Sequence, residues 1–197
     1  VDASARELAR AIDSRLTEDA VNILMLAHRF PYPPTRGDQV RAWCELKRLT
    51  DRYDVWFGCV DGRAPNPNHL AHVRARCRDV AVAVRPSGVS LARGAWGLLR
   101  GRSLTQSYLH DDRLAQAIRR WSETVAFDAV LTFSGGMAPY AELVDARRRV
   151  LDMNDADSFK FRTYARRSRW PLSVLYRAES RQLAGREMDW ARGHDLT

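Results

Sequence analysis

The chain has 197 residues, of which 45% are hydrophobic and 28% charged, and its net charge is +8. This length and composition fit one globular domain with a buried core, and fit two full domains poorly. No apolar run approaches the roughly 18–20 residues of a membrane span. The charged N-terminus lacks the apolar region of a signal peptide, so a cytoplasmic protein is expected.

Apolar patterning predicts strands and helices that alternate along the chain. Residues 1–20 are expected to form a helical extension, because apolar positions in 4–16 share one helical face. Continuous apolar runs are typical of buried parallel strands, and apolar positions three and four apart predict helices. Strands are predicted at 21–28, 54–60, 79–84, 127–133 and 148–155, and helices at 38–51, 67–77, 89–100, 111–124, 137–146, 156–166 and 172–191.

The sequence also predicts the buried face of one helix, the cap of another and the conformation of the chain end. The helix at 38–51 is expected to turn Val40, Trp43, Cys44 and Leu46 inward. Asp111 is expected to cap the helix that follows it. The last four residues, HDLT, look like the opening of another strand.

The alternation predicts an α/β fold: a three-layer, Rossmann-like domain whose mostly parallel sheet is covered by helices on both faces. In such sheets ligands bind outside the carboxyl ends of the strands. This rule directs attention to three segments, at residues 28–41, 134–137 and 152–160.

The first segment is a proline-stiffened loop that enters a helix at Gly37. A helix N-terminus favours anions, and a glycine there lets a ligand approach the backbone closely. Arg36 and Arg41 add positive charge, so a phosphate-binding site is predicted at Arg36, Gly37, Asp38 and Arg41. The alternative is an ordinary connecting loop in which Asp38 caps the helix. Since GxGxxG and P-loop motifs are absent from the sequence, binding of NAD, FAD or ATP by those motifs is not expected.

The second and third segments follow the last two predicted strands. Ser134, Gly135, Gly136 and Met137 could line a binding site, or form a tight turn that needs a positive φ. In the third segment, a carboxylate could orient or deprotonate a sugar hydroxyl. Asp152 and Asp155 are the catalytic candidates there, whereas Asp157 is expected to cap the next helix.

Cysteines and histidines do not predict a metal site. Cys44, Cys59 and Cys77 form no CxxC pair and fit no zinc spacing, so they are interpreted as small buried hydrophobic residues. His69 and His72 share a helical face, but no carboxylate or thiol completes a ligand set.

Positive charge is concentrated near the C-terminus. Residues 160–192 hold nine Lys or Arg and three Asp or Glu, and so carry six of the eight net positive charges. This stretch could lie on an anionic membrane surface, at the inner face of the membrane, or simply be a solvated helix face. No nucleic-acid partner is expected, because the aromatic and basic residues do not interleave as in RNA-binding domains.

Four ordered motifs between residues 21 and 190 resemble one enzyme family. They are ILMLAHRFPYPPTRGDQVRAW, FDAVLTFSGGM, VLDMNDADSFK and WPLSVLYRAE. The chain resembles retaining GT-B glycosyltransferases of the family-four type, especially the sugar transferases associated with exosortase-linked exopolysaccharide loci. Residues 1–20 lie outside the resemblance.

The resemblance implies two facing Rossmann-like domains, of which residues 21–197 would be the N-terminal, acceptor-side one. The nucleotide-sugar donor is expected in the missing C-terminal domain, and no covalently bound cofactor is expected. The partners would be a nucleotide-sugar and a glycan or lipid-linked acceptor, and the whole enzyme would be a hexosyltransferase. The present chain alone is expected to be inactive; the alternative is a non-catalytic module that binds a glycan or a partner.

The resemblance also places the candidate residues. Gly37, Asp38 and Arg41 fall on the family's loop between acceptor and donor phosphate, and residues 134–137 and 152–157 fall on turns that line the cleft. Many relatives have a histidine near the end of the fourth or fifth strand. This sequence has none there, so no single residue is assigned as catalytic.

Overall fold

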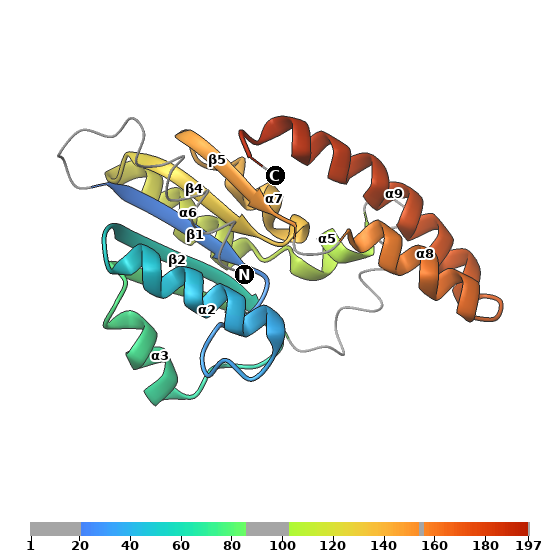
Figure 1. Ribbon diagram of the computed structural model, residues 1–197, viewed down its shortest axis with the longest axis horizontal. Coiled ribbons are helices and arrows are strands. Elements are labelled where there is room, and N and C mark those ends of the chain that lie inside the picture. The colour runs from blue at the N-terminus through green and yellow to red at the C-terminus, as the bar shows by residue number, and fades with distance from the viewer. Residues whose placement is uncertain (1–20, 86–102, 154–155, 197) are drawn as a thin grey trace.

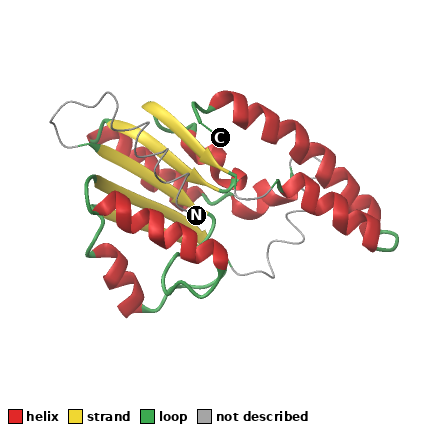
Figure 2. Cartoon of the chain, in the orientation of Figure 1, coloured by secondary structure: helices red, strands yellow, loops and turns green. Residues whose placement is uncertain are grey.

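The computed structural model describes residues 21–85, 103–153 and 156–196, as strands alternating with helices (Figures 1 and 2). The helices predicted at 4–16 and 89–100, and the candidate Asp155, lie outside the described residues. The strands are β1 (Asn22–Ala27), β2 (Asp54–Asp61), β3 (Asp79–Val84), β4 (Phe127–Phe133) and β5 (Ala146–Asp152). The helices are α2 (Gly37–Thr50), α3 (Pro67–Arg74), α5 (Leu104–Leu109), α6 (Asp112–Thr124), α7 (Ala138–Ala141), α8 (Asp157–Arg167) and α9 (Leu172–Gly193), with a 3-10 turn η1 (Gly135–Met137) before α7.

The five strands form one parallel sheet in the order β3-β2-β1-β4-β5. The central strand β1 is paired on both sides, so that its last residue, Ala27, lies opposite Cys59 of β2 and Phe133 of β4. This arrangement confirms the predicted α/β, Rossmann-like fold.

Both faces of the sheet are covered, which explains the continuous apolar strands. Ile23 and Met25 of β1 pack in one core cluster with Trp43 and Leu46 of α2. The alternate residues Leu24 and Leu26 point to the other face and join a second cluster, together with Leu114, Ile118 and Trp121 of α6. Successive side chains of a strand point to opposite faces, so a strand buried on both faces has no polar side.

Helices α8 and α9 form a hairpin that extends beyond the carboxyl ends of the strands (Figure 1). A small core cluster of Ala138, Leu151, Leu183 and Trp190 joins it to the sheet. None of the described helices combines the length and apolarity needed to cross a membrane.

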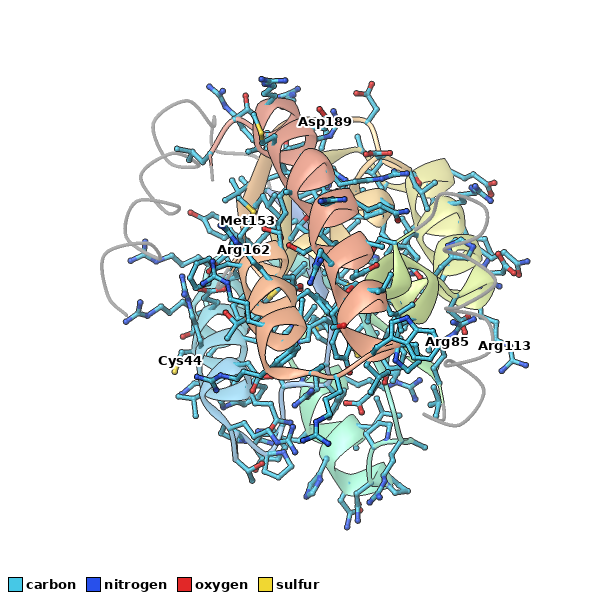
Figure 3. All side chains as sticks on the ribbon, turned by 90° about the vertical axis from the view of Figure 1, so that its right-hand side faces the viewer. Cys44, Arg85, Arg113, Met153, Arg162 and Asp189 are labelled. Atoms are coloured by element: carbon cyan, nitrogen blue, oxygen red, sulfur yellow. The ribbon has the colours of Figure 1, made fainter. Side chains whose placement is uncertain are left out.

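Helix α2 corrects two predictions about buried side chains. Its buried residues are Ala42, Trp43, Glu45, Leu46 and Leu49. Val40 is instead 42% exposed, and Cys44 lies on the outside of the helix (Figure 3). The apolar stripe is thus narrower than predicted, and Glu45 occupies part of the buried face. Of the other cysteines, Cys59 is buried, as predicted, and Cys77 is half-buried.

The segment after β4 was also predicted with the wrong boundaries. The helix expected at 137–146 is reduced to η1 and the four-residue α7, and β5 begins at Ala146 and ends at Asp152 instead of spanning 148–155. Pairing with β4 starts where Ala146 meets Phe127, so the chain from Ala146 onward belongs to the sheet and not to a helix. Helix α5 was not predicted.

One of the two predicted helix caps, Asp111, is confirmed, and the other, Asp157, is not. The Asp111 carboxylate accepts a hydrogen bond from the Arg113 N–H at 2.9 Å, which confirms the predicted cap. Asp157 is wrong as a cap: it is the first residue of α8, whose N-cap is Ala156. The role falls to Glu187 of α9, which accepts from the Ser158 N–H at 2.9 Å. Leu196 forms a parallel bridge with Val150, consistent with the strand-like end of the sequence.

Candidate functional site

The predicted segments meet where the strand order reverses. From β1 the chain moves outward to β2 and β3, whereas β4 lies on the other side of β1 and is followed by β5. Doubly wound sheets bind ligands outside the carboxyl ends of their strands, at such a reversal. His28 follows β1, Ser134 follows β4, and Asp152 ends β5. Residues far apart in the sequence are therefore brought to one edge of the sheet.

The N-terminus of α2 opens this site. Arg36 is the N-cap, with extended backbone (φ −128°, ψ 158°), and no side chain caps the helix. The first-turn N–H groups and the helix dipole therefore favour an anion. A Cβ added at Gly37 would meet no atom within 4 Å, and both Arg36 and Gly37 are exposed. An anionic group could thus approach the helix end closely.

The loop that leads into α2 is held by Asp61, at the end of β2. Its carboxylate accepts a hydrogen bond from the Phe30 N–H at 2.9 Å. The Gln39 amide of α2 donates to the Phe30 carbonyl at 3.0 Å, and its oxygen accepts from the Thr35 hydroxyl at 2.9 Å. These bonds fix the loop against the sheet, so the first turn of α2 has a defined position.

Asp38 joins two basic residues from the end of β1. Its Oδ2 lies 3.4 Å from His28 Nε2 and 3.4 Å from a terminal guanidinium nitrogen of Arg29. The His28 ring stacks on Phe133, with ring centroids 5.9 Å apart. Burial lowers the pKa of His28, while the Asp38 carboxylate opposes that shift. The interpretation of Asp38 as a helix cap is wrong, since its carboxylate pairs with residues outside the helix.

Arg41 connects α2 to β5. A terminal guanidinium nitrogen lies 2.6 Å from Asp152 Oδ2, and Nε lies 3.5 Å from Glu45 Oε1. The guanidinium carbon also lies over the Phe133 ring, 5.9 Å from its centroid. Arg41 thus forms ion pairs with two carboxylates, Asp152 and Glu45, both of which are largely shielded from water.

Glu45 is the strongly perturbed acid of this group. Burial, followed by repulsion from Asp152, raises its pKa to about 7, and the positive charge of Arg41 acts in the opposite direction. Its Oε2 is buried without a hydrogen-bond partner. Perturbed acids gather at functional sites, although structural ion pairs can perturb them as well.

The turn after β4 is strained at Ser134. Its φ is +86°, a conformation that side-chain-bearing residues rarely adopt. The Ser134 N–H donates to the Asp152 carbonyl at 2.8 Å, and the Met137 N–H donates to the Ser134 carbonyl at 3.0 Å. Such strain costs on the order of 1–3 kcal/mol and gathers at functional sites. The positive φ expected in this turn belongs to the serine.

The two glycines of this turn make room for neighbouring helices. A Cβ on Gly135 would lie 3.3 Å from the Trp190 ring, and one on Gly136 would lie 2.4 Å from Leu109 Cδ1. Gly135, Gly136 and Met137 are all buried. The two glycines thus let α9 and α5 pack closely against the turn, and Ser134 before them is 9% exposed.

The site combines predicted residues with four that the prediction did not assign a role. Of the predicted residues, Arg41 pairs with Asp152, and Asp38 pairs with His28 and Arg29. Arg36 and Gly37 are the N-cap and first residue of the same helix, α2. His28 and Arg29 could have been assigned because they directly follow β1. Glu45 could have been assigned because an acid four residues after Arg41 shares its helical face. For Asp61 the sequence offered a weaker indication than for the other three residues, namely a carboxylate at the end of a strand, β2.

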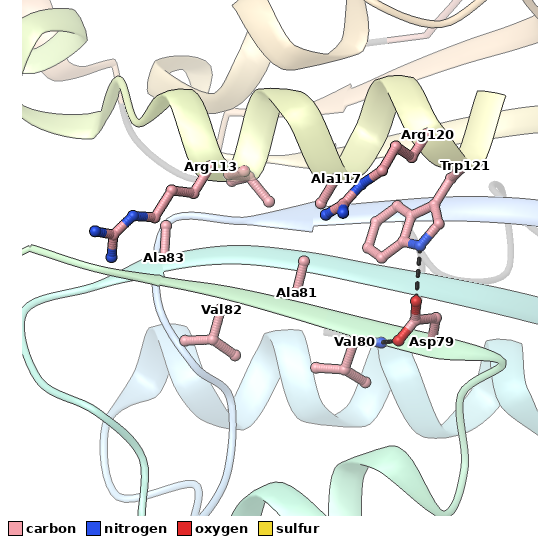
Figure 4. Close-up of a pocket in the computed structure, with 10 residues that line it drawn as sticks. Asp79, Val80, Ala81, Val82, Ala83, Arg113, Ala117, Arg120 and Trp121 are labelled. Atoms are coloured by element: carbon pink, nitrogen blue, oxygen red, sulfur yellow. Dashed lines mark hydrogen bonds between the residues drawn. The ribbon is translucent and has the colours of Figure 1, made fainter. Parts of the chain in front are cut away.

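Among the described residues, no three His, Cys, Asp or Glu side chains are grouped so as to hold a metal ion. A separate hollow lies between the edge strand β3 and α6 (Figure 4). The Trp121 indole N–H donates to Asp79 there at 2.8 Å, and Arg113 and Arg120 line it. It contains none of the predicted site residues.

No protein-family model, curated protein or solved structure matches the chain. The function is therefore inferred from the geometry of this site and from the sequence motifs that form it.

Proposed function

We propose that this chain is the acceptor-side domain of a GT-B glycosyltransferase that moves a sugar from a nucleotide-sugar to an envelope or exopolysaccharide glycan. The observation that carries the proposal is the meeting of three motif segments, at His28–Arg41, Ser134 and Asp152, where the strand order reverses. These are segments on which the resemblance to the transferases rests.

The chemistry of the site suits phosphate and hydroxyl groups. The uncapped N-terminus of α2 and the exposed Arg36 would face a phosphate, with Arg41 close behind. Stabilising negative charge on the leaving diphosphate would supply most of the rate enhancement in such a transfer. The Asp152 carboxylate would accept a hydrogen bond from an acceptor hydroxyl. The donor nucleotide-sugar would bind to a second domain.

The test is sugar transfer by the protein isolated from its own cells. Labelled nucleotide-sugars would be incubated with it and with glycan lipids extracted from the same cells. We expect label in the lipid fraction, and a loss of turnover on the order of a hundredfold for Arg41→Ala. Arg74→Gln, an exposed arginine of α3, is the control and should leave turnover unchanged. Absence of transfer with every donor would reject the proposal.

A second candidate is a non-catalytic module that binds a glycan or a partner. Leu172, Val174 and Met188 of α9 are 49%, 55% and 56% exposed, which favours a surface that another molecule covers. The intact mass in the source cells separates the two candidates. About twice 22.5 kDa fits the two-domain enzyme, whereas 22.5 kDa itself favours the binding module.

A further inference from the structure

One face of the α8–α9 hairpin carries two pairs of arginines flanked by apolar side chains. We define this hairpin face by Phe159, Arg162 and Arg166 of α8 and by Val174, Arg177, Arg181 and Met188 of α9, all of which are exposed. Within each helix these positions are separated by three, four or seven residues and so lie along one side. Figure 3 shows the two helices side by side, with Arg162 on α8.

The four arginines of this face gather around one hollow. It lies between the helices, has a volume of about 560 Å³, and is lined by Arg162, Arg166, Arg177 and Arg181 together with Ser180 and two alanines. Four guanidinium groups around one hollow repel each other unless anions lie among them, so this part of the hairpin favours an anionic surface.

The exposed charge of the hairpin is mostly positive. Residues 157–189 contain eight Lys or Arg, all exposed, and four acids, of which Glu179 and Glu187 are buried, Asp157 is half-buried and Asp189 is exposed. Glu179 accepts hydrogen bonds from Ser103 and Thr105, at 2.7–3.0 Å, and Glu187 accepts from Ser158. Because these acids face inward, they offer the exposed arginines little neutralisation. Lys160 lies 3.8 Å from Asp157, one turn away.

The tip of the hairpin is apolar and flanked by arginine. Trp170, in the turn that joins the two helices, is 81% exposed, and Leu172, the first residue of α9, is 49% exposed. Arg167 and Arg169 precede them and are exposed as well. Tryptophan is favoured at the boundary between lipid head groups and acyl chains, and arginine can extend from there to phosphate.

We propose that the hairpin face docks the chain on a bilayer that contains anionic lipids, with the arginines on lipid phosphates and Trp170 and Leu172 in the head-group region. A protein partner fits less well, because the apolar side chains are separated by arginines instead of forming a contiguous apolar centre. A nucleic acid would leave Leu172, Val174 and Met188 without a role. Docking here needs no sugar donor, so it goes beyond the proposed function and can be tested separately.

The test is flotation of the chain with vesicles of phosphatidylcholine, with or without one third phosphatidylglycerol. We expect binding to the anionic vesicles only, weakening as salt is added. Each basic residue at an anionic surface contributes roughly fivefold, so Arg166→Gln, Arg177→Gln and Arg181→Gln together should weaken binding about a hundredfold. The matched control replaces Arg113, Arg119 and Arg120, three exposed arginines of α6, and changes the net charge equally.

The outcomes are distinct. Equal weakening by both triple variants would mean that net charge alone drives binding, and would overturn the assigned face. Equal binding to neutral vesicles, or binding to single-stranded nucleic acid but to no vesicle, would overturn the proposal itself. Trp170→Ala should weaken binding at high salt as well as low salt, because its contribution is apolar. An unchanged affinity for this variant would show that the tip of the hairpin does not contact the bilayer.

Discussion

At the scale of single residues, the candidate site is a small set of charges that compensate each other. The Arg41 guanidinium lies 2.6 Å from the Asp152 carboxylate and 3.5 Å from the Glu45 carboxylate. Glu45 is 6% exposed and keeps one carboxylate oxygen without a partner. The site therefore holds one buried acid whose ionisation opposes folding near neutral pH.

Glu45 should make the protein less stable as pH rises. Its pKa is raised from 4.5 to about 7 in the folded state, so the protonated form is favoured there. Its contribution to stability is therefore complete below pH 4.5 and is lost as pH rises through 7, by about 3 kcal/mol. Glu45→Gln should be up to about 3 kcal/mol more stable than the unmodified chain at pH 8, and similar to it at pH 4.5.

Urea unfolding of both chains between pH 4.5 and 8 measures this difference. The lowered pKa of His28 acts in the opposite direction, with stability lost as pH falls, but it cancels in the comparison. Glu142→Gln, the same substitution at an exposed position, is the matched control. A constant difference between the unmodified chain and Glu45→Gln across this range would contradict the raised pKa.

The ion pair of Arg41 and Asp152 should be measurable as a coupling energy. Arg41→Ala, Asp152→Ala and the double variant form a cycle in urea unfolding at pH 7. We expect a coupling of about 1–2 kcal/mol, because the contact is short, at 2.6 Å, but 15–26% of each side chain remains exposed. Additive effects would show that the pair contributes nothing to stability.

At the scale of elements, two glycines at helix starts have different roles. Gly37 begins α2 in open space, whereas Gly136 lies in η1 against the side chains of Leu109 and Thr105 of α5. A glycine that starts a helix at a strand end therefore does not by itself indicate a ligand.

Alanine at the two positions should have opposite effects. Gly37→Ala should change stability by less than about 1 kcal/mol, in the stabilising direction, because it restricts the unfolded chain and meets no atom. Gly136→Ala should cost about 1–3 kcal/mol, because its Cβ would lie 2.4 Å from buried Leu109. Thermal unfolding of both variants is the measurement, and equal melting temperatures would contradict the packing role of Gly136.

At the scale of the whole molecule, the sheet and the hairpin differ in the size of the apolar clusters that stabilise them. The sheet has two large core clusters, one on each face. The hairpin is joined to it by the small cluster around Leu183 and Trp190, by hydrogen bonds to Glu179, and by the Leu196 bridge.

The hairpin should therefore open before the sheet. Regions with few buried apolar contacts open at lower free energy than the global core. We expect the amides of α8 and α9 to exchange with solvent faster than those of β1 and β4 in native conditions. Leu183→Ala, at 1% exposure, should speed exchange in the hairpin and leave β1 unchanged. Equal acceleration in both would mean that the molecule opens as one unit.

The prediction succeeded where a local pattern has one structural solution. The run at 21–28 is apolar without alternation, and a strand buried on both faces accounts for it. Helix boundaries failed where tertiary pairing matters: periodicity extends a helix to residue 146, whereas α7 ends at Ala141 and Ala146 already pairs in the sheet. The inward face of α2 failed at Val40 and Cys44, because a helical period does not say how wide the covered stripe is.

By itself, the sequence determined the α/β class and the parallel sheet, because these follow from apolar periodicity, and it predicted the edge of the sheet at which a ligand would bind, from the direction of parallel strands. Only the tertiary structure decided which charges meet there. The pairs of Arg41 with Asp152 and of Asp38 with His28 join segments that are 111 and 10 residues apart, and their contacts depend on strand register and on the position of α2. The same is true of the mostly positive outside of the hairpin, since Glu179 and Glu187 could be recognised as buried only once α5 and α8 were packed against α9.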